Sequence, residues 1–181
     1  VYQGDELGLP EAEIAYEDLK DPYGITMWPE FKGRDGCRTP MPWAANAADL
    51  GFSPDPSTAQ TPWLPVSESH RLLAVDAQDS PPDSLLNFYR TLLHWRKSQP
   101  ALLDGDMSVL APDAQVLAYV RSCPTQRVLC LFNFSDKAAT WSIPPGYVVS
   151  SLLSESGLAG AQLVGGKIQM APWAGMFALL A

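Results

Sequence analysis

Proline placement is the feature that most restricts the fold of this chain. Eleven of its 17 prolines fall within the first 82 residues, and residues 21–82 show neither a sustained helical period nor strand alternation. Proline lacks a backbone N–H and interrupts both helix interiors and central strands. This part is also rich in Trp, Phe and Met, which a solvated linker lacks. The sequence therefore predicts an ordered functional loop that packs against something larger.

A single amphipathic helix is predicted where the proline-rich part ends. The segment Ser80–Pro100 carries signals at both ends, with Ser80 as the N-cap, Pro81 at the first helical position and Pro100 as the stop. Apolar side chains recur at helical spacing in between, which predicts one buried face. The members of this face are Leu85, Leu86, Tyr89, Leu92 and Leu93.

Strand patterns replace the helical period from Asp104 onward. Short runs of β-branched, aromatic and aliphatic residues are separated by Pro, Gly, Ser or Asp. These runs cover residues 115–122, 127–135, 139–144, 147–153, 161–164, 167–170 and 176–181. The pair Gly165–Gly166 between two of them is a hairpin signal. We predict a small antiparallel β-sandwich with Trp141 and Trp173 in its core.

Charge and cysteine usage exclude several classes of protein. The net charge of -8 over 181 residues, without a basic run, argues against nucleic acid binding, which depends on phosphate neutralisation. No apolar run approaches the ~18 residues of a membrane span, and no signal peptide is visible. The three cysteines lack CxxC spacing, which argues against a zinc site and favours thiols in a reducing, cytoplasmic compartment. A Cys123–Cys130 bridge stays open.

Two arginines stand four residues apart in a segment poorly suited to a helix or a strand. The run FKGRDGCRTPMPW (residues 31–43) places Arg34 and Arg38 among two glycines and two prolines. A guanidinium offers five donors in a fixed fork and stays charged at any working pH. Such a loop arginine can be aimed at a carboxylate or a ring of hydroxyls. Loop arginines more commonly bind backbone carbonyls, and the residue types alone favour that use.

Several motifs, taken in this order, resemble the C-terminal third of glycoside hydrolase family 13, the α-amylase superfamily. YQGDELGLP (residues 2–10) resembles the eighth barrel strand and the turn after it. DPYGITMWPEFKGRDGCRTPMPW (21–43) resembles the loop that follows, in its α-glucosidase form. LGFS (50–53), PWLPV (62–66) and SLLNFYRTLLHWRKSQPAL (84–102) resemble later family segments, the last of them the final barrel helix. The nearest subgroup is the bacterial α-glucosidases and oligo-1,6-glucosidases.

The resemblance implies the end of a (β/α)₈ barrel followed by a β-sandwich. Residues 1–103 would be the C-terminal end of the catalytic barrel, with its last strand, long active-site loop and last helix. Residues 104–181 would be the β-sandwich known as domain C. The strand-like start at Val1 indicates a fragment, so the N-terminal remainder of the barrel is a predicted partner. No cofactor is implied, and a structural calcium in the whole enzyme would have no evident site here.

The resemblance also implies the reaction and one site residue. Active sites of such barrels lie on the loops after the strands, and the arginine of the family's GRD run contacts the sugar at the cleaved bond. By that match Arg34 binds the substrate, a terminal α-linked glucose of a small oligosaccharide. Retaining hydrolysis uses a carboxylate nucleophile and a carboxylic acid about 5 Å apart. In the family these lie on earlier strands, so no catalytic residue is expected in this chain.

Four other residues of the same loop are candidates for supporting the site. Arg38 is expected to hold the loop. Asp35 either orients an arginine or is a solvated loop carboxylate. Trp28 and Phe31 either stack on a sugar face or close the loop onto a core, which is the commoner use of large aromatics.

The remaining ionisable groups offer no substitute for the missing catalytic pair. Asp5 and Glu6 are neighbours on an extended segment, so their side chains would point to opposite faces and could not flank one bond. His70 and His94 have no serine or carboxylate partner at readable spacing, and His94 is expected to pack or face solvent.

Three alternatives to a hydrolytic function stay open. The parent enzyme could mainly transfer or isomerise glucose, as related sucrose-isomerising and trehalose-forming enzymes do. The chain could instead be a non-catalytic carbohydrate-binding or scaffold module, which exposed coplanar aromatics on the sandwich would favour. It could also be a truncated product without its own function, which exposed apolar faces within residues 1–82 would indicate.

Overall fold

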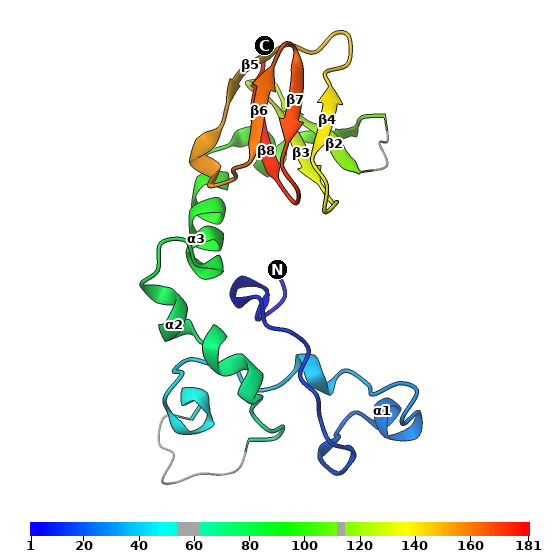
Figure 1. Cartoon of the computed structure of the whole chain (residues 1–181), viewed down its shortest axis with the longest axis vertical. Coiled ribbons are helices and arrows are strands. Elements are labelled where there is room, and N and C mark those ends of the chain that lie inside the picture. Colours follow the sequence, from blue (N-terminus) through cyan, green and yellow to red (C-terminus); the bar gives the residue numbers. More distant parts are fainter. Residues whose placement is uncertain (54–61, 112–114) are drawn as a thin grey trace. The chain divides into compact units, whose positions relative to one another are not determined.

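The structure is a computed structural model of the whole chain (Figure 1). It describes residues 1–53, 62–111 and 115–181. These residues form two compact units, Val1–Tyr89 and Arg90–Ala181. Among the residues described, no helix is long and apolar enough to cross a membrane.

The first unit is built from short helical segments joined by loops. Its α-helices before residue 85 are α1 (Pro22–Thr26) and α2 (Val75–Asp79). Single 3₁₀ segments occupy Asp5–Leu7, Tyr16–Asp18, Asp35–Cys37, Ala48–Gly51 and Glu68–Leu73. The described part of this unit therefore has no long regular element before residue 85, as the proline placement predicts.

The opening residues are not paired as a strand in this structure. Val1–Gln3, which the resemblance assigns to a barrel strand, are followed by a turn at Gly4, whose φ is 99°. A parallel strand requires a hydrogen-bonded neighbour, and the described part of this unit contains no other strand. The carboxylates of Asp5 and Glu6 instead accept the backbone N–H groups of Tyr2 and Gly4, at 2.7 and 3.0 Å.

Helix α3 (Leu85–Arg96) begins later than the sequence pattern predicts. The expected N-cap, Ser80, lies at the C-terminal end of α2. Ser84 Oγ accepts the N–H of Asn87 at 3.2 Å, which is the geometry of an N-cap. The reason for the shift is Pro82, because the residue before a proline is driven out of the α conformation.

The buried face of α3 also differs from the prediction. Leu85 and Leu93 are 39% and 44% exposed. Leu86 is buried in the core of the first unit, and Trp95 is buried in the core of the second. The single apolar stripe read from the sequence is therefore wrong at these two leucines, because separate cores cover the start and the end of the helix.

Two elements that follow α3 in the chain were not predicted. Helix α4 (Pro100–Asp104) has Pro100 at its first helical position, so the proline that ends one helix also starts the next. Strand β1 (Asp106–Val109) is exposed at all four positions and, among the described residues, pairs only with β2 (Val116–Cys123). Its sequence DMSV alternates polar and apolar residues, but four positions are at the lower limit for recognising a strand from alternation.

The second unit is an antiparallel β-sandwich (Figure 1). Its five-stranded sheet has the order β1-β2-β3-β8-β5 and its three-stranded sheet the order β4-β7-β6. The further strands are β2 (Val116–Cys123), β3 (Gln126–Asn133), β4 (Ala139–Ser142), β5 (Val149–Leu152), β6 (Ala161–Val164), β7 (Lys167–Met170) and β8 (Gly175–Leu180). All seven predicted runs form strands, and the predicted sandwich is confirmed.

The hairpin between β6 and β7 forms as the sequence predicts. Val164 pairs with Lys167, and the two glycines between them have φ values of 56° and 75°. Positive φ at both central positions is the requirement of the type I′ turn, which matches the twist of paired strands. Glycine meets this requirement without steric cost.

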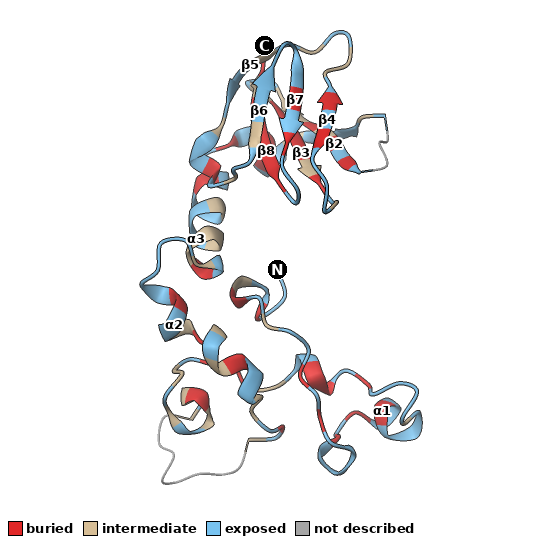
Figure 2. Cartoon of the chain, viewed as in Figure 1, coloured by how far each residue is buried: buried red, intermediate tan, exposed pale blue. Residues whose placement is uncertain are grey.

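The core of the sandwich lies between its two sheets. Buried positions recur along β2, β3 and β8 (Figure 2) and meet Trp141 and Ile168 of the smaller sheet. Trp141 is 6% exposed, as predicted. Trp173 is 68% exposed, so its predicted place in the core is wrong. It lies in the connection from β7 to β8 with φ at 56°, outside the strand alternation that would direct it inward.

Candidate functional site

The loop that carries the two arginines is anchored by a buried carboxylate. Asp35 is 0% exposed, and its Oδ2 accepts the backbone N–H groups of Lys20 at 2.6 Å and of Asp21 at 2.7 Å. Its Oδ1 has no hydrogen-bond partner among the residues described. Asp35 is therefore not a solvated carboxylate, and in the described part of the chain it pairs with no arginine. It ties residues 20–21 to the GRD run instead.

A second buried carboxylate, Asp21, holds the first arginine. Asp21 Oδ2 accepts the backbone N–H of Arg34 at 3.0 Å and its side-chain Nε–H at 3.2 Å. The other oxygen of Asp21 accepts the N–H of Tyr23 at 3.1 Å and so caps α1. The hydrogen bond from the Arg34 side chain, followed by that from the Tyr23 N–H, lowers the pKa of Asp21 from its usual 3.8.

The free end of Arg34 faces outward. Its side chain is 65% exposed, against 3% for that of Asp21. Among the described residues, its Nη1 and Nη2 atoms have no hydrogen-bond or ion-pair partner. Because a guanidinium carries its donors in a rigid plane, holding Nε leaves both terminal nitrogens available to a ligand. The arrangement is a fixed cation that can donate several hydrogen bonds at once.

Two glycines bring the segment before Arg34 into backbone contact with α1. A Cβ added at Gly24 would lie 2.5 Å from the Lys32 carbonyl oxygen. A Cβ added at Gly33, which has φ 78°, would lie 2.9 Å from the Gly24 Cα. No side chain fits at this crossing. The backbone of Lys32 and Gly33, which precedes Arg34, is therefore packed directly against α1.

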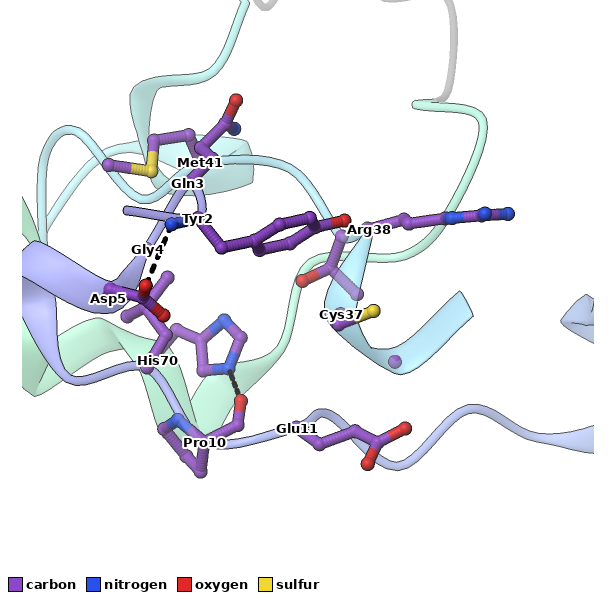
Figure 3. A pocket seen from close by; sticks show the side chains of 13 residues that line it. Tyr2, Gln3, Gly4, Asp5, Pro10, Glu11, Cys37, Arg38, Met41 and His70 are labelled. Atoms are coloured by element: carbon purple, nitrogen blue, oxygen red, sulfur yellow. Dashed lines mark hydrogen bonds between the residues drawn. The ribbon is translucent and has the colours of Figure 1, made fainter. Parts of the chain in front are cut away.

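The second arginine lies beside a pocket of about 350 Å³ in the same unit (Figure 3). Tyr2, Asp5, Met41 and His70 are among the residues that line this pocket, and Arg34 is not. The Arg38 side chain extends away from the His70 ring in Figure 3. Its guanidinium makes no hydrogen bond or ion pair within the described part of the chain. The role of Arg38 in holding the loop stays a prediction.

His70 has a structural contact at the floor of this pocket. It is 2% exposed, and its Nε2 lies 2.8 Å from the carbonyl oxygen of Pro10. A carbonyl can only accept, so Nε2 carries the hydrogen and donates it. Nδ1 is buried and has no partner among the described residues. His70 thus fixes the segment after the first 3₁₀ turn, a contact 60 residues away in sequence that no local pattern signals.

The loop aromatics lie in two different environments. Trp28 packs against the buried cluster of Ala12, Ile14 and Leu19. Phe31 is 42% exposed, and its ring centroid lies 5.2 Å from that of Tyr23. A contact of either ring with a sugar stays a prediction.

Neither a metal-binding cluster nor a disulfide is found within residues 1–53, 62–111 and 115–181. No group of three or more His, Cys, Asp or Glu side chains there is placed to hold a metal ion. All three cysteines are free thiols, so the Cys123–Cys130 bridge is not formed. Burial raises the pKa of Cys130 to about 12, which keeps it as an inert thiol.

The family of the chain follows from comparison with known proteins. The family model for the alpha amylase catalytic domain matches residues 1–105, and the model for the maltogenic amylase C-terminal domain matches residues 107–175. The first match alone covers more than half of the chain. The chain therefore belongs to the α-amylase family, and the predicted fold class, a barrel end followed by a β-sandwich, is confirmed.

Curated relatives include α-glucosidases from several bacteria. A probable alpha-glucosidase from Rhizobium meliloti (strain 1021) is 44% identical over 181 residues, which is 100% of this chain and 31% of that protein. An oligo-1,6-glucosidase from Parageobacillus thermoglucosidasius is 27% identical over 96% of this chain and 34% of its own length. The chain thus spans about a third of the length of these relatives.

Solved structures of longer proteins contain the same fold. The alpha-glucosyl transfer enzyme XgtA matches 100% of this chain and 32% of its own, with a TM-score of 0.89 and 43% identity. The trehalulose synthase MutB from Pseudomonas mesoacidophila MX-45 matches 99% of this chain and 35% of its own, with a TM-score of 0.80 and 26% identity.

The sequence patterns singled out Arg34 and missed Asp21, the carboxylate that holds it. Asp21 and Arg34 are 13 residues apart and meet only through the fold. One local signal was present, because Asp followed by Pro is a helix N-cap pattern. This pattern predicts the start of α1, but it does not predict that Asp21 also binds Arg34.

Proposed function

We propose that this chain is the C-terminal part of a retaining α-glucosidase that releases terminal α-linked glucose from small oligosaccharides. Relatives named as alpha-glucosidase and oligo-1,6-glucosidase support the substrate class. The observation that carries the proposal is Arg34, a charged side chain held at Nε with both terminal nitrogens free. The motif around it, GRDGCRTPMPW, is the one that resembles the α-glucosidase loop.

In this proposal the chain binds and orients the sugar. The two Nη groups of Arg34 donate to hydroxyl oxygens of the glucose unit at the cleaved bond. A permanent charge makes these hydrogen bonds stronger than those of a neutral donor. Trp28, Phe31, Asp35 and Arg38 belong to the surrounding loop, and the first two are candidates for contact with the apolar face of the sugar.

The bond-breaking groups are proposed to come from the N-terminal remainder of the barrel. A retaining glycosidase places its nucleophile and its acid/base about 5 Å apart across the scissile bond. The proposed partner of this chain is therefore the part of the catalytic domain that carries this pair. The scheme uses no cofactor. The free thiols are compatible with the proposed cytoplasmic location.

The test uses a chimera in which this chain replaces the matching part of the Rhizobium meliloti relative. Arg34→Ala should lower kcat/KM for p-nitrophenyl α-glucoside by about 10- to 100-fold, the range for a lost hydrogen bond from a charged group. Lys32→Ala is the matched control, because it removes an exposed ion pair with Glu13 in the same loop. It should leave kcat/KM unchanged.

Two results would contradict the proposal. The unsubstituted chimera could fold, as judged by circular dichroism, and yet fail to hydrolyse the glucoside. Alternatively, Arg34→Ala could leave both kcat/KM and the unfolding temperature at their original values. The first result would contradict the proposed glucosidase activity, and the second would contradict the proposed contact between Arg34 and the sugar.

Glucosyl transfer is a second candidate, favoured by the similarity to the alpha-glucosyl transfer enzyme of known structure. Transfer and hydrolysis share the same covalent intermediate and differ in what attacks it. In the full-length enzyme, hydrolysis releases glucose and p-nitrophenol in equal amounts. A deficit of glucose relative to p-nitrophenol would identify transfer as the main reaction.

A further inference from the structure

We infer that Asp21 is the positioning residue of the substrate-binding loop, which sets the direction of the Arg34 guanidinium without touching the sugar. The inference rests on the proposed role of Arg34 in substrate binding. It assigns a function to a buried residue outside the GRDGCRTPMPW motif.

The contacts of a single carboxylate oxygen carry the first step. Asp21 Oδ2 accepts both the backbone N–H and the side-chain Nε–H of Arg34, at 3.0 and 3.2 Å. One oxygen atom therefore holds Arg34 at two points, the backbone nitrogen and the side-chain Nε. The torsions between these two points are restricted, and the plane of the guanidinium is set by the position of the carboxylate.

The support behind Asp21 carries the second step. Its own N–H is held by the fully buried Asp35 at 2.7 Å, and its Oδ1 is engaged by the Tyr23 N–H. With a side chain 3% exposed, against 65% for Arg34, Asp21 is the fixed member of the pair. Asp35 therefore fixes the backbone of Asp21, and Asp21 in turn fixes Arg34.

The energetic consequence concerns binding more than bond cleavage. A long exposed arginine loses side-chain freedom when it binds a ligand, and this loss weakens binding. A guanidinium already held at Nε has lost most of that freedom before the sugar arrives. An interaction that is equally strong in the ground state and in the transition state changes KM and leaves kcat. We therefore expect loss of Asp21 to act mainly on KM.

The experiment is a double-mutant cycle in the chimera described above. Asp21→Asn keeps the size and an acceptor oxygen but removes the charge. It should raise KM for p-nitrophenyl α-glucoside roughly 10-fold, below the ~100-fold that a 1 Å misplacement can cost. In an Arg34→Ala background the same substitution should change kcat/KM by less than about 2-fold, because coupled residues are not additive.

A second variant distinguishes loss of the Arg34 contact from loss of the local fold. Asp21→Ser retains a good N-cap for α1 but is too short to reach Arg34 as well. It should raise KM as Asp21→Asn does, while the unfolding temperature stays close to that of Asp21→Asn. Lys32→Ala again serves as the control for the loop.

The outcomes separate this inference from the proposed function. Equal losses from Asp21→Asn with and without Arg34 would show that Asp21 acts on the loop in general, which overturns the inference. An unchanged KM for Asp21→Asn, together with a large effect of Arg34→Ala, would also overturn it and leave the proposed function intact. No effect of Arg34→Ala would remove both.

Discussion

Two buried carboxylates with different partners organise the loop at the scale of single residues. Asp35 binds only backbone amides, whereas Asp21 binds a helix N-terminus and a charged side chain. Both lie at less than 5% exposure, and buried carboxylates persist only when hydrogen bonds or charges compensate their lost hydration. The loop therefore depends on the ionised state of Asp21.

Acid should weaken the folded state through Asp21. Its pKa is lowered in the folded protein from the usual 3.8, chiefly by the Arg34 side chain. The ionised form therefore adds stability above the unfolded pKa, and this contribution is lost as the pH falls through the lowered value. The unfolding temperature of the unsubstituted protein should exceed that of Asp21→Asn at neutral pH, and the gap should close as the pH falls below 3.8 and through the lowered pKa of Asp21.

Thermal unfolding followed by circular dichroism at a series of pH values checks this expectation. Arg34→Ala provides the comparison, since it removes the first cause of the lowered pKa. A gap between the unsubstituted protein and Asp21→Asn that persists unchanged into strong acid would contradict the assignment.

At the residue scale the role of Arg34 in binding substrate stays a prediction, and the structure adds the carboxylate that holds it. Arg34 was identified because a specific run of glycine, arginine and proline resembles a family motif. The alternative of a solvated Asp35 was wrong, because its burial depends on contacts with Lys20 and Asp21, which a local pattern cannot place. Trp173 was misread because a tryptophan in a turn has the same composition signal as one in a strand.

At the scale of elements, the sequence patterns predicted the strands better than they predicted the start of α3. The seven apolar runs became strands because alternation and flanking turn residues agree. The start of α3 was predicted too early, because two serines and two prolines in this segment each match the pattern of a helix start. The exposed strand β1 and the short helix α4 span only four and five residues, too few for a sequence period to identify them.

Ser84→Ala should destabilise the protein by about 0.5–2 kcal/mol, the range for loss of an N-cap. Ser84 Oγ accepts the Asn87 N–H and donates to the Gln78 carbonyl at 2.7 Å, so both contacts disappear. Ser80→Ala is the matched control and should fall within about 0.5 kcal/mol of the unsubstituted protein. Urea denaturation measures both. A larger cost for Ser80→Ala than for Ser84→Ala would show that the helix starts at the earlier serine.

The two units differ in how they are stabilised when the whole molecule is considered. The sandwich has one large core of residues from both sheets. The first unit has two small buried clusters, centred on Leu7 and on Ile14, and leaves Tyr23, Trp63 and Leu72 at 59%, 67% and 84% exposure. Hydrophobic burial is the main favourable term in folding. The first unit therefore has less internal support than the second.

The chain by itself should not hydrolyse p-nitrophenyl α-glucoside. In our proposal it binds sugar, and the carboxylate pair that cleaves the bond comes from the N-terminal remainder of the barrel. Intact mass of the purified protein should be near 19.7 kDa, and release of p-nitrophenol should stay at the uncatalysed level. The active chimera is the positive control. Hydrolysis by the chain alone, with retention at the anomeric carbon, would return attention to Asp5, Glu6 and Asp35.

The three thiols of this chain differ in accessibility, which makes one of them useful as a reporter. Cys37 is exposed, and its Sγ lies 3.1 Å from the carbonyl oxygen of Arg34. Cys130 is buried, and Cys123→Ser would remove the partly exposed competitor. A fluorophore or spin label attached at Cys37 would then lie beside Arg34, the proposed sugar-binding residue. Occupancy of the loop could be followed optically, on ligands that are never turned over.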